Sequence, residues 1–200
     1  MARQHEAPIH KLRPTQITIG FIEVSVKRKE LEALKKHQQR DFLAQHMIPA
    51  VYGPDERVHI TDHHHLARAA LEAGSETGFF LIEADLQQLE PSAFWREMGE
   101  KRWAHPIDER GRRQPFTAIP KHLKELRDDV YRSIAGFVRT AGGYEKTPTA
   151  FCEFAWADFF RQRIVVGPTH DDFARAVSEA LALARSAAAC DLPGFRGALR

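Results

Sequence analysis

The strongest constraint on the fold of this chain is a strand–turn–strand pattern in residues 47–60. Residues 47–52 are typical of a short strand, and Val58 and Ile60 alternate with polar residues as in a half-buried strand. Residues 53–55 (Gly-Pro-Asp) have the chemistry of a tight turn, because Gly tolerates positive φ and Pro fixes φ. The two strands are therefore predicted to form a β-hairpin.

A helix and a further strand are predicted directly after this hairpin. Apolar residues recur there at i, i+3, i+4 and i+7 and precede Gly74, as in a buried helix face and its end: Leu66, Ala69, Ala70 and Ala73. Residues 79–82 form a continuous apolar run, which is typical of a central strand. This order of elements predicts an α/β (α+β) fold with a small mixed sheet and helices.

Patterns elsewhere in the chain complete the predicted layout. Before the hairpin, a loose start is followed by an alternating strand and a helix rich in helix formers, over residues 1–13, 17–21 and 28–45. After it come a short helix, a loop and three helices, over 91–98, 104–118, 123–134, 147–159 and 169–184. The last helix opens with a Thr169–Asp172 capping box. The predicted organisation is a flexible lead-in, an α/β core and a mainly helical extension packed on the core as one compact unit, over 1–13, 14–90 and 91–200.

The overall charge argues against a strongly basic nucleic-acid binder. Lys and Arg number 29 against 27 Asp and Glu, which gives a formal net charge of +2. Any contact with a polyanion must therefore come from a local patch. No segment approaches the ~20 apolar residues that cross a bilayer, so we expect no membrane contact and a cytoplasmic location. The sequence leaves both a monomer and a homo-oligomer open.

Asp62, His63, His64 and His65 stand where the second strand of the hairpin enters the predicted helix. The first amides of a helix lack intrahelical partners and the dipole adds positive charge, so such an end can bind anions. Asp62 suits the N-cap position, and histidines in the first turn can contact phosphate or transfer a proton near neutral pH. The alternative is a capped helix whose histidines are surface or packing residues.

A zinc site is a minor alternative at this motif. Consecutive helical residues diverge by ~100°, so three neighbouring histidines cannot all face one ion. A divalent cation held mainly by phosphate and one carboxylate, such as Asp62, fits the motif better.

The order strand, turn, strand and then Asp62 to Leu66 opening a helix resembles the ParB/sulfiredoxin superfamily, and more specifically its ParB-like nuclease family. In that superfamily the matching segment often reads Asp-Gly-His-His-Arg or a Gly-Cys-His-Arg variant, and it binds nucleotide phosphates. Further stretches carry the resemblance in order along the chain: Leu12–Gln16, Tyr131–Gly136, Ala141–Tyr144 and Phe154–Phe159. The resemblance spans residues 12–193 and implies a ParB/sulfiredoxin-like fold that handles phosphate groups of a nucleotide or nucleic acid.

This chain departs from the superfamily pattern at two positions of the motif. It has His63 where Gly is usual and Leu66 where Arg is usual. Gly lets a backbone approach phosphate closely and Arg can bind phosphate in a bidentate manner, so the usual nucleotide pose is not expected to carry over. No Cys occupies the sulfiredoxin position and no helix-turn-helix DNA reader follows, so neither sulfinic-acid reduction nor chromosome partitioning is expected.

The resemblance also draws attention to Glu23, just after the first predicted strand. An acidic residue in this region serves superfamily members that phosphorylate free serine. The resemblance therefore makes Glu23 a candidate general base or metal-bridging carboxylate. The alternative is a solvent-facing glutamate at a strand end.

Basic residues in two other segments could supply further phosphate contacts. They lie in a Lys-Arg-Lys run and in a Gly-containing loop: Lys27, Arg28, Arg112 and Arg113. Trp103 and Phe116 flank that loop and could stack on bases, a combination found in single-strand binding proteins. The alternative is that these charges are solvated surface residues.

The sequence therefore favours an enzyme that acts on phosphate groups, either a nuclease-like phosphodiester hydrolase or a nucleotide-dependent phosphotransferase or NTPase. The predicted catalytic residues are Asp62, His64, His65 and Glu23, and the predicted phosphate-binding residues are His63, Lys27, Arg28, Arg112 and Arg113. Mg²⁺ or Mn²⁺ is expected to neutralise charge on phosphorus, with a nucleotide or nucleic acid as substrate or ligand. The alternative is a non-catalytic nucleotide- or nucleic-acid-binding module of the same fold.

Overall fold

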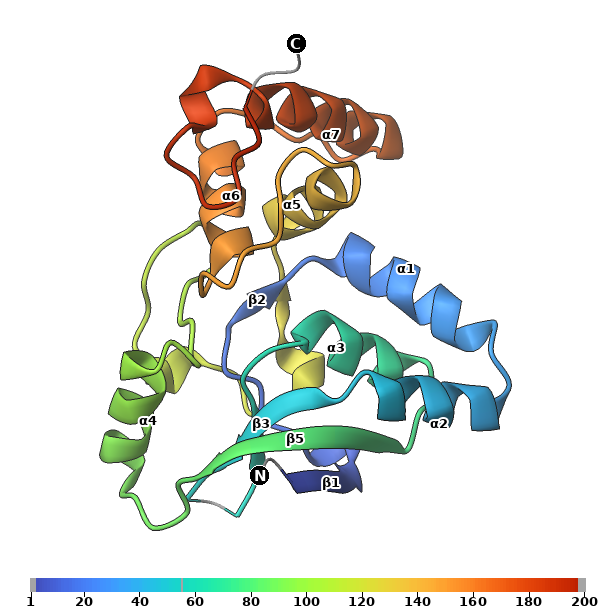
Figure 1. Cartoon of the computed structure of the whole chain (residues 1–200), viewed down its shortest axis with the longest axis vertical. Helices are drawn as coiled ribbons and strands as arrows, with labels where there is room; N and C mark the ends of the chain where they lie inside the picture. The colour runs from blue at the N-terminus through green and yellow to red at the C-terminus, as the bar shows by residue number, and fades with distance from the viewer. Residues whose placement is uncertain (1–2, 55, 198–200) are drawn as a thin grey trace. The chain divides into compact units, whose positions relative to one another are not determined.

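The computed structural model describes residues 3–54 and 56–197, which form two compact units (Figure 1). The first unit comprises the chain up to residue 19 together with 24–128, and the second comprises 20–23 together with the chain from 129. The boundary lies after residue 128 and not after 90, because the intervening segment pairs with the first unit: the Arg127 N–H donates to the Ile17 carbonyl at 3.0 Å. Asp55 of the predicted turn lies outside the described residues.

The first unit is built on a mixed sheet of four strands in the order β1-β5-β3-β4. The strands are β1 (Arg3–Pro8), β3 (Ile48–Tyr52), β4 (Val58–Ile60) and β5 (Thr77–Asp85). Strand β5 pairs antiparallel with β1 and parallel with β3, and β3 pairs antiparallel with β4. The predicted hairpin, the central apolar strand and the mixed α/β class are confirmed.

The predicted flexible lead-in is wrong for the described part of residues 1–13. Residues 3–8 form the edge strand β1, and Ile9–Lys11 form the 3₁₀ helix η1. Main-chain pairing with β5 does not require apolar side chains, so polar residues can form an edge strand with one solvated face. Buried Ile9 and Leu12 then anchor the segment in the core.

After η1 the chain runs along the free edge of β4. The Arg13 N–H donates to the Val58 carbonyl at 2.9 Å, and the Ile60 N–H donates to the Arg13 carbonyl at 3.0 Å. This pairing brings residues 13–15 beside the start of the helix that follows β4.

Helices and short turns complete the first unit. They are α1 (Phe21–Glu32), α2 (Lys36–Gln45), α3 (His64–Glu72), α4 (Pro91–Glu100), η2 (Phe116–Ala118) and η3 (Leu123–Glu125), with a parallel strand pair of β2 (Thr18–Ile19) and β6 (Arg127–Asp128). The first turn of α1 groups with the second unit. The strand predicted over 17–21 is limited to β2, because α1 begins at Phe21.

The single helix predicted over residues 28–45 is two helices, α1 and α2. The buried Gln39 side chain donates to the Leu31 carbonyl at 2.8 Å, which satisfies the last turn of α1. The Gln38 side chain accepts from the Lys35 N–H at 3.0 Å, which begins α2. These local hydrogen bonds favour a break at residues 33–35 over a continuous helix.

Two apolar clusters fill the first unit. The larger one joins Ile60 and Phe80 of the sheet to Ala67 and Ala70 of α3. The helix predicted from its apolar stripe is therefore confirmed as a helix packed on the sheet. The smaller cluster surrounds buried Phe94 of α4.

The second unit is a helical bundle. Its elements are α5 (Val130–Thr140), α6 (Cys152–Arg161), α7 (His170–Ala184) and the 3₁₀ turn η4 (Ala187–Ala189). The core is aromatic, with the rings of Tyr144 and Trp156 stacked at 4.3 Å. Helix α7 confirms the predicted capping box, in which the Asp172 N–H donates to Thr169 Oγ1 at 3.1 Å.

The two helices predicted over 123–134 and 147–159 begin later in the structure than predicted. Apolar residues at 123, 126 and 130 fit a helical repeat, yet residues 123–128 form η3 and β6 because the main chain at 127–128 pairs with β2. Helix α6 begins at Cys152 with Phe151 as its N-cap.

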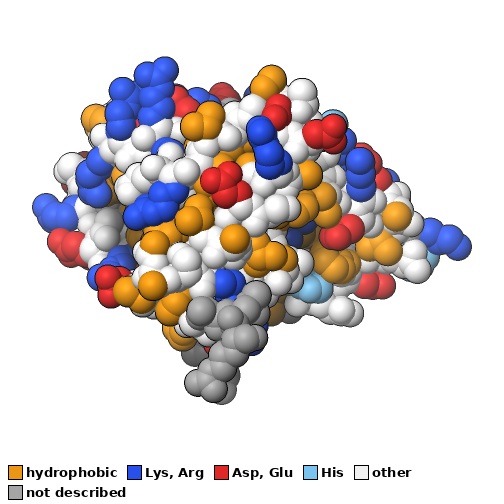
Figure 2. All heavy atoms as spheres, turned by 90° about the horizontal axis from the view of Figure 1, so that it is seen from above, with side chains coloured by type: hydrophobic (Ala, Val, Ile, Leu, Met, Phe, Trp, Pro, Cys, Tyr) orange, Lys and Arg blue, Asp and Glu red, His pale blue; other side chains and the backbone are white. Residues whose placement is uncertain are grey.

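The surface mixes charged and apolar side chains. On the face seen in Figure 2, Lys and Arg side chains are interspersed with Asp and Glu and with apolar groups. Among the helices of residues 3–54 and 56–197, none combines the length and the apolar character needed to span a bilayer. With a net charge of +2, any polyanion contact must depend on a local group of cations.

Candidate functional site

The turn between β4 and α3, residues 61–65, is here called the β4–α3 junction. Helix α3 begins at His64, and its N-cap is His63, whose φ of 60° and ψ of 28° lie in the left-handed region. Asp62 precedes the cap, and its Oδ1 accepts a hydrogen bond from the His63 N–H at 2.7 Å. The prediction that Asp62 is the N-cap is therefore wrong by one residue.

The left-handed backbone of His63 explains one departure from the superfamily pattern. Gly adopts positive φ without steric cost, whereas an L-residue there loses roughly 1–2 kcal/mol. Histidine is among the residues that enter this region more often than most. His63 therefore keeps the turn that Gly would form and adds an imidazole at the junction.

The start of α3 is not capped by the side chain of its own N-cap residue. The His63 side chain makes no capping hydrogen bond, and the first turn contains no acidic residue. The first amides of a helix point outward and carry the positive end of its dipole. The junction therefore places the positive end of a helix next to the exposed Asp62 carboxylate.

His64 is held by the segment that runs along β4. Its side chain is 4% exposed, and its Nε2 accepts a hydrogen bond from the Thr15 N–H at 3.1 Å. The Thr15 hydroxyl lies 3.3 Å from the same nitrogen but donates its hydrogen to the Ile60 carbonyl at 2.7 Å. Since Nε2 accepts, the ring proton of neutral His64 lies on Nδ1. This geometry fixes residues 13–15 against the start of α3.

A second carboxylate reaches the junction from β5. The Thr61 hydroxyl donates to Glu83 Oε2 at 2.7 Å. The register of β5 against β3 shifts between the Ala50–Ile82 and Val51–Ala84 pairs, so Glu83 is the extra residue of a β-bulge. Bulges redirect side chains and are frequent beside functional sites. Nothing local in the sequence marks Glu83, because the bulge depends on pairing with β3.

The remaining positions of the motif are packed. His65 is 8% exposed in the first turn of α3. Arg68, two residues after the Leu66 that replaces the usual Arg, donates to Glu72 at 2.6 Å and to the Leu123 carbonyl at 2.9 Å. Arg68 is therefore occupied along the body of α3 and does not substitute for the missing arginine.

Arg28 of α1 lies near the C-terminal end of α3, away from the junction. Arg28 pairs with Glu32 at 3.7 Å and with Glu72 at 3.8 Å. Glu72 ends α3, which places it about 12 Å along the helix axis from His64. Lys27 precedes Arg28 on the same helix. The prediction that Arg28 binds phosphate at the junction is not supported by this position.

The loop that carries Arg112 and Arg113 is organised around a buried aspartate. Asp108 is 2% exposed and accepts from the Arg112 N–H at 2.9 Å, from the Arg112 side chain at 3.0 Å and from Gln114 at 2.8 Å. Burial opposes the charged form, yet these hydrogen bonds and that of Arg110 lower the pKa of Asp108 to about 2. Arg112 is thus a structural partner of Asp108, and the Arg113 guanidinium lies 5.9 Å from the Phe116 ring centre.

Glu23 lies in the first turn of α1, not at a strand end, and belongs to the second unit. Its N–H donates to the Ser133 hydroxyl at 3.4 Å. The Glu23 carboxylate lies against Gly136, where a Cβ would approach Oε2 to 2.5 Å. Gly136 therefore provides the space for this carboxylate within the second unit.

The sequence did not single out Asp129, which caps α5. Its Oδ1 accepts from the Tyr131 N–H at 3.1 Å, and its Oδ2 accepts from Arg161. Asp129 is 4% exposed, and burial raises its pKa to about 6 against the lowering effects of Arg161, Arg132 and the Tyr131 N–H. A turn-forming aspartate directly before a helical pattern was the available signal for this cap.

Comparison with known families identifies the chain. A family model described as "Putative ParB-like nuclease" matches residues 5–162, which include the junction and both strands that support it. The chain belongs to the ParB-like nuclease family. The resemblance drawn from residues 62–66 and the stretches that follow is thereby confirmed.

Solved structures were compared with this ParB-like nuclease family member. Protein Atu1540 from Agrobacterium tumefaciens is 41% identical, with a TM-score of 0.92, over 100% of this chain and 99% of that chain. The C-terminally truncated chromosome-partitioning protein ParB from Caulobacter crescentus, complexed with CTP-gamma-S, is 14% identical, with a TM-score of 0.33, over 92% of this chain and 93% of that chain. The first likeness shows a shared fold, and the second supports no structural argument. No curated protein matches the chain.

The carboxylates at the junction bear on whether a divalent cation could be shared there with a phosphate ligand. Within the described part of the chain, no three His, Cys, Asp or Glu side chains are grouped to bind a metal ion. Mg²⁺ is commonly held by one or two carboxylates plus substrate phosphates. Exposed Asp62, with Glu83 linked to the neighbouring Thr61, fits that pattern of ligands.

Proposed function

We propose that this ParB-like nuclease family member is a phosphodiester hydrolase that acts on a nucleic acid or nucleotide at the β4–α3 junction. The observation that carries the proposal is the N-terminus of α3, whose N-cap residue His63 adopts a left-handed backbone and directly follows an exposed Asp62. A helix end of this kind attracts phosphate, and a carboxylate beside it can act on the bound group.

The roles follow from position. The first-turn amides of α3 bind the phosphate oxygens, because they form the positive end of the helix, and the His63 imidazole at the N-cap adds a further donor. Asp62 orients or deprotonates the attacking water, and Glu83 supports it through Thr61. A divalent cation bound by Asp62 and phosphate would neutralise the charge that develops on phosphorus.

The histidines divide into different roles in this proposal. His64 is a positioning residue, because its Nε2 is occupied by the Thr15 N–H. His65 is the other first-turn histidine and the remaining candidate for proton transfer. Arg28 and Arg112 receive no phosphate-binding role, since each pairs with a carboxylate.

A second candidate function is a non-catalytic module that binds a nucleotide or nucleic acid. The specific observation in its favour is that two of the three motif histidines, His64 and His65, are buried at 4% and 8% exposure. Asp62 would then act only in the turn, through its hydrogen bond from the His63 N–H.

The test is an assay of pure full-length protein with Mg²⁺ and with Mn²⁺. Substrates are nucleoside di- and triphosphates and single- and double-stranded DNA and RNA. The variants are Asp62→Asn and His65→Gln, with Asp41→Asn on the exposed surface of α2 as the matched control. We expect Asp62→Asn to lower turnover about 100-fold or more and Asp41→Asn to leave it unchanged.

The outcomes separate the two candidate functions. Cleavage of a phosphodiester that is lost in Asp62→Asn supports the hydrolase. Thermal stabilisation by one substrate without any turnover supports the binding module. Turnover that survives in Asp62→Asn contradicts the assignment of the junction as the active site.

A further inference from the structure

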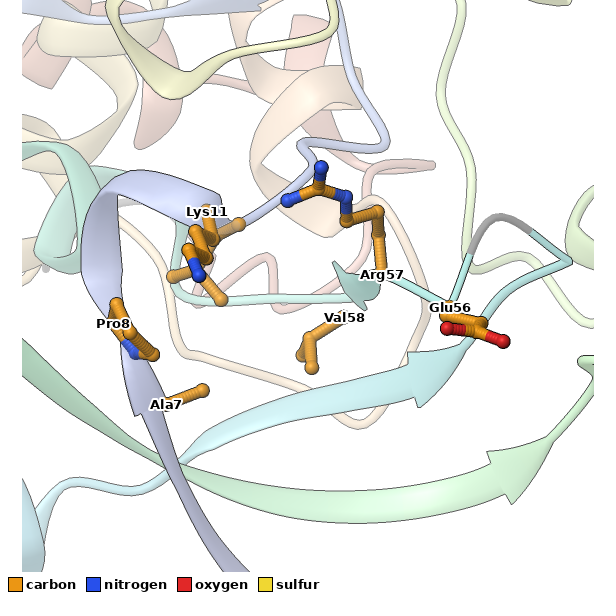
Figure 3. A pocket seen from close by; sticks show the side chains of 7 residues that line it. Ala7, Pro8, Lys11, Glu56, Arg57 and Val58 are labelled. Carbon is orange, nitrogen blue, oxygen red and sulfur yellow. The ribbon is translucent and has the colours of Figure 1, made fainter.

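A solvent-open pocket of about 350 Å³ lies at the end of β4 remote from α3 (Figure 3). Its apolar lining comes from Ala7, Pro8, Leu12 and Val58. Lys11 and Arg57 also line the pocket, and Figure 3 shows them on either side of Val58. Glu56 also lines the pocket. In this view Arg57 lies between Lys11 and Glu56. The pocket therefore combines apolar walls with two cations.

One segment of chain connects this pocket to the β4–α3 junction. Lys11 lines the pocket, Arg13 pairs through its main chain with both ends of β4, and the Thr15 N–H donates to His64 at 3.1 Å. Residues 11–15 span at most about 14 Å. The pocket and the candidate phosphate site thus lie at the two ends of one short edge.

Several Lys and Arg residues lie along this edge. The Arg13 guanidinium donates to the Lys121 carbonyl at 2.7 Å, which places Lys121 beside Arg13. Lys11, Arg57 and Lys121 are exposed, and Arg13 is half-buried. We call Lys11, Arg13, Arg57 and Lys121 the basic track. Glu125 accepts from the Lys121 N–H at 3.1 Å and from the His122 N–H at 3.1 Å, so its carboxylate is engaged by main-chain donors.

We infer that the basic track binds the backbone of a single-stranded nucleic acid, with one nucleotide unit in the pocket and a phosphate further along at the start of α3. This inference rests on the proposed function, because it names the substrate class of the same site. A mononucleotide carries its phosphates at one end only, whereas the cations of the basic track and the start of α3 are spread along the whole edge, as the phosphates of a strand are. A duplex keeps its bases stacked inside, whereas an unpaired strand can place a base or sugar against apolar walls.

The experiment measures binding of a dye-labelled oligothymidine to the full chain across a salt series, in the absence of divalent cation. Wild type is compared with the Lys11→Ala/Arg57→Ala double variant and with a Lys29→Ala/Lys146→Ala control. The control removes the same charge from exposed positions outside the track. Oligouridine, CTP, ATP and polyglutamate are bound in parallel, and the fold of each variant is checked by thermal unfolding.

We expect the double variant to bind oligothymidine about tenfold more weakly, with a salt slope reduced by about 1.4, because each phosphate contact on a single strand contributes about 0.7. Its affinity for CTP and ATP should stay within about twofold, since phosphate binding at α3 is retained. The control should match wild type.

Several results would overturn the inference. They are unchanged oligonucleotide binding in the folded double variant, an equal loss in the control, polyglutamate bound as tightly as oligothymidine, or a wild type that binds nucleotides but no oligonucleotide. Failure of the proposed function would give a different result from failure of this inference. Turnover would then survive in Asp62→Asn, while oligonucleotide binding would still depend on Lys11 and Arg57.

Discussion

Helices α3 and α5 both begin just after a short strand, and each has an aspartate near its start. At α5, Asp129 is the N-cap, is 4% exposed, accepts from the Tyr131 N–H and pairs with Arg161. At α3, the N-cap is His63 without a side-chain cap, and Asp62 is exposed one residue earlier. The same residue type is therefore the buried N-cap of one helix and an exposed residue just before the N-cap of the other.

This difference between Asp129 and Asp62 suggests that the first aspartate serves stability and the second serves function. A capped and paired aspartate satisfies the helix amides and anchors the neighbouring helix. An uncapped end keeps its positive potential for a ligand. We therefore expect changes at Asp129 to affect folding and changes at Asp62 to affect phosphate chemistry.

The largest expected effect on stability is at the α5 end. Asp129→Ala removes the cap and the buried partner of Arg161, so the free energy of unfolding should fall by about 3 kcal/mol. Asp62→Ala should change it by about 0.5 kcal/mol or less, because the side chain is exposed. Urea unfolding of both variants measures this contrast. Equal losses at the two positions would remove the distinction between the helix ends.

The next effect is expected at His64. His64→Leu leaves the buried Thr15 N–H without its acceptor, which should cost about 2 kcal/mol of unfolding free energy. His37→Leu on the exposed surface of α2 is the control and should be nearly neutral. Chemical denaturation reports both. If His64→Leu proves as neutral as its control, the positioning role of His64 is wrong.

A pH dependence is expected at the α5 end. Burial raises the pKa of Asp129 from 3.8 to about 6, so the stability linked to protonation of this carboxyl is fully present below about 4 and is lost as pH rises through about 6. The unfolding free energy of wild type relative to Asp129→Asn should therefore fall by about 1–2 kcal/mol between about pH 4 and pH 7. Denaturation across this range tests the sign, and a constant or rising difference would contradict it.

The smallest effect is expected at the hydrogen bond between Thr61 and Glu83, beside the start of α3. Thr61→Val removes the hydrogen bond to Glu83 and should lower stability by less than about 1 kcal/mol. Turnover should fall several-fold, because Glu83 loses its orientation. Thr140→Val in α5, which loses a part-buried hydrogen bond to the Gly136 carbonyl, should leave turnover unchanged. Equal activity in the two variants would exclude a role for the Thr61–Glu83 pair.

Much of the α/β unit could be predicted from local pattern. The hairpin, the apolar stripe of α3 and the central strand follow period-2 and helical spacing, and the structure has all three. The start of a helix at the motif Asp62–His65 also follows from the sequence. Its cap could not be predicted to the residue, because the choice between Asp62 and His63 depends on a backbone φ of 60°.

The other features depend on contacts between distant residues. Thr15 and His64 are 49 positions apart, so no local pattern links them. Glu83 reaches the junction through a bulge set by pairing with β3. Arg28 and Arg112 looked available as phosphate ligands because their carboxylate partners, Glu72 and Asp108, are recognised only once the chain is folded.

The most direct test of the central claim is amide NMR of the ¹⁵N-labelled protein during titration with a nucleoside triphosphate and with oligothymidine. The account predicts saturable shifts of the His64, His65 and Leu66 amides at the start of α3, with the Tyr131 and Arg132 amides of the capped α5 unchanged. Shifts at α5 alone, or saturation elsewhere in the chain with the α3 amides unmoved, would contradict the assignment of the β4–α3 junction as the phosphate site.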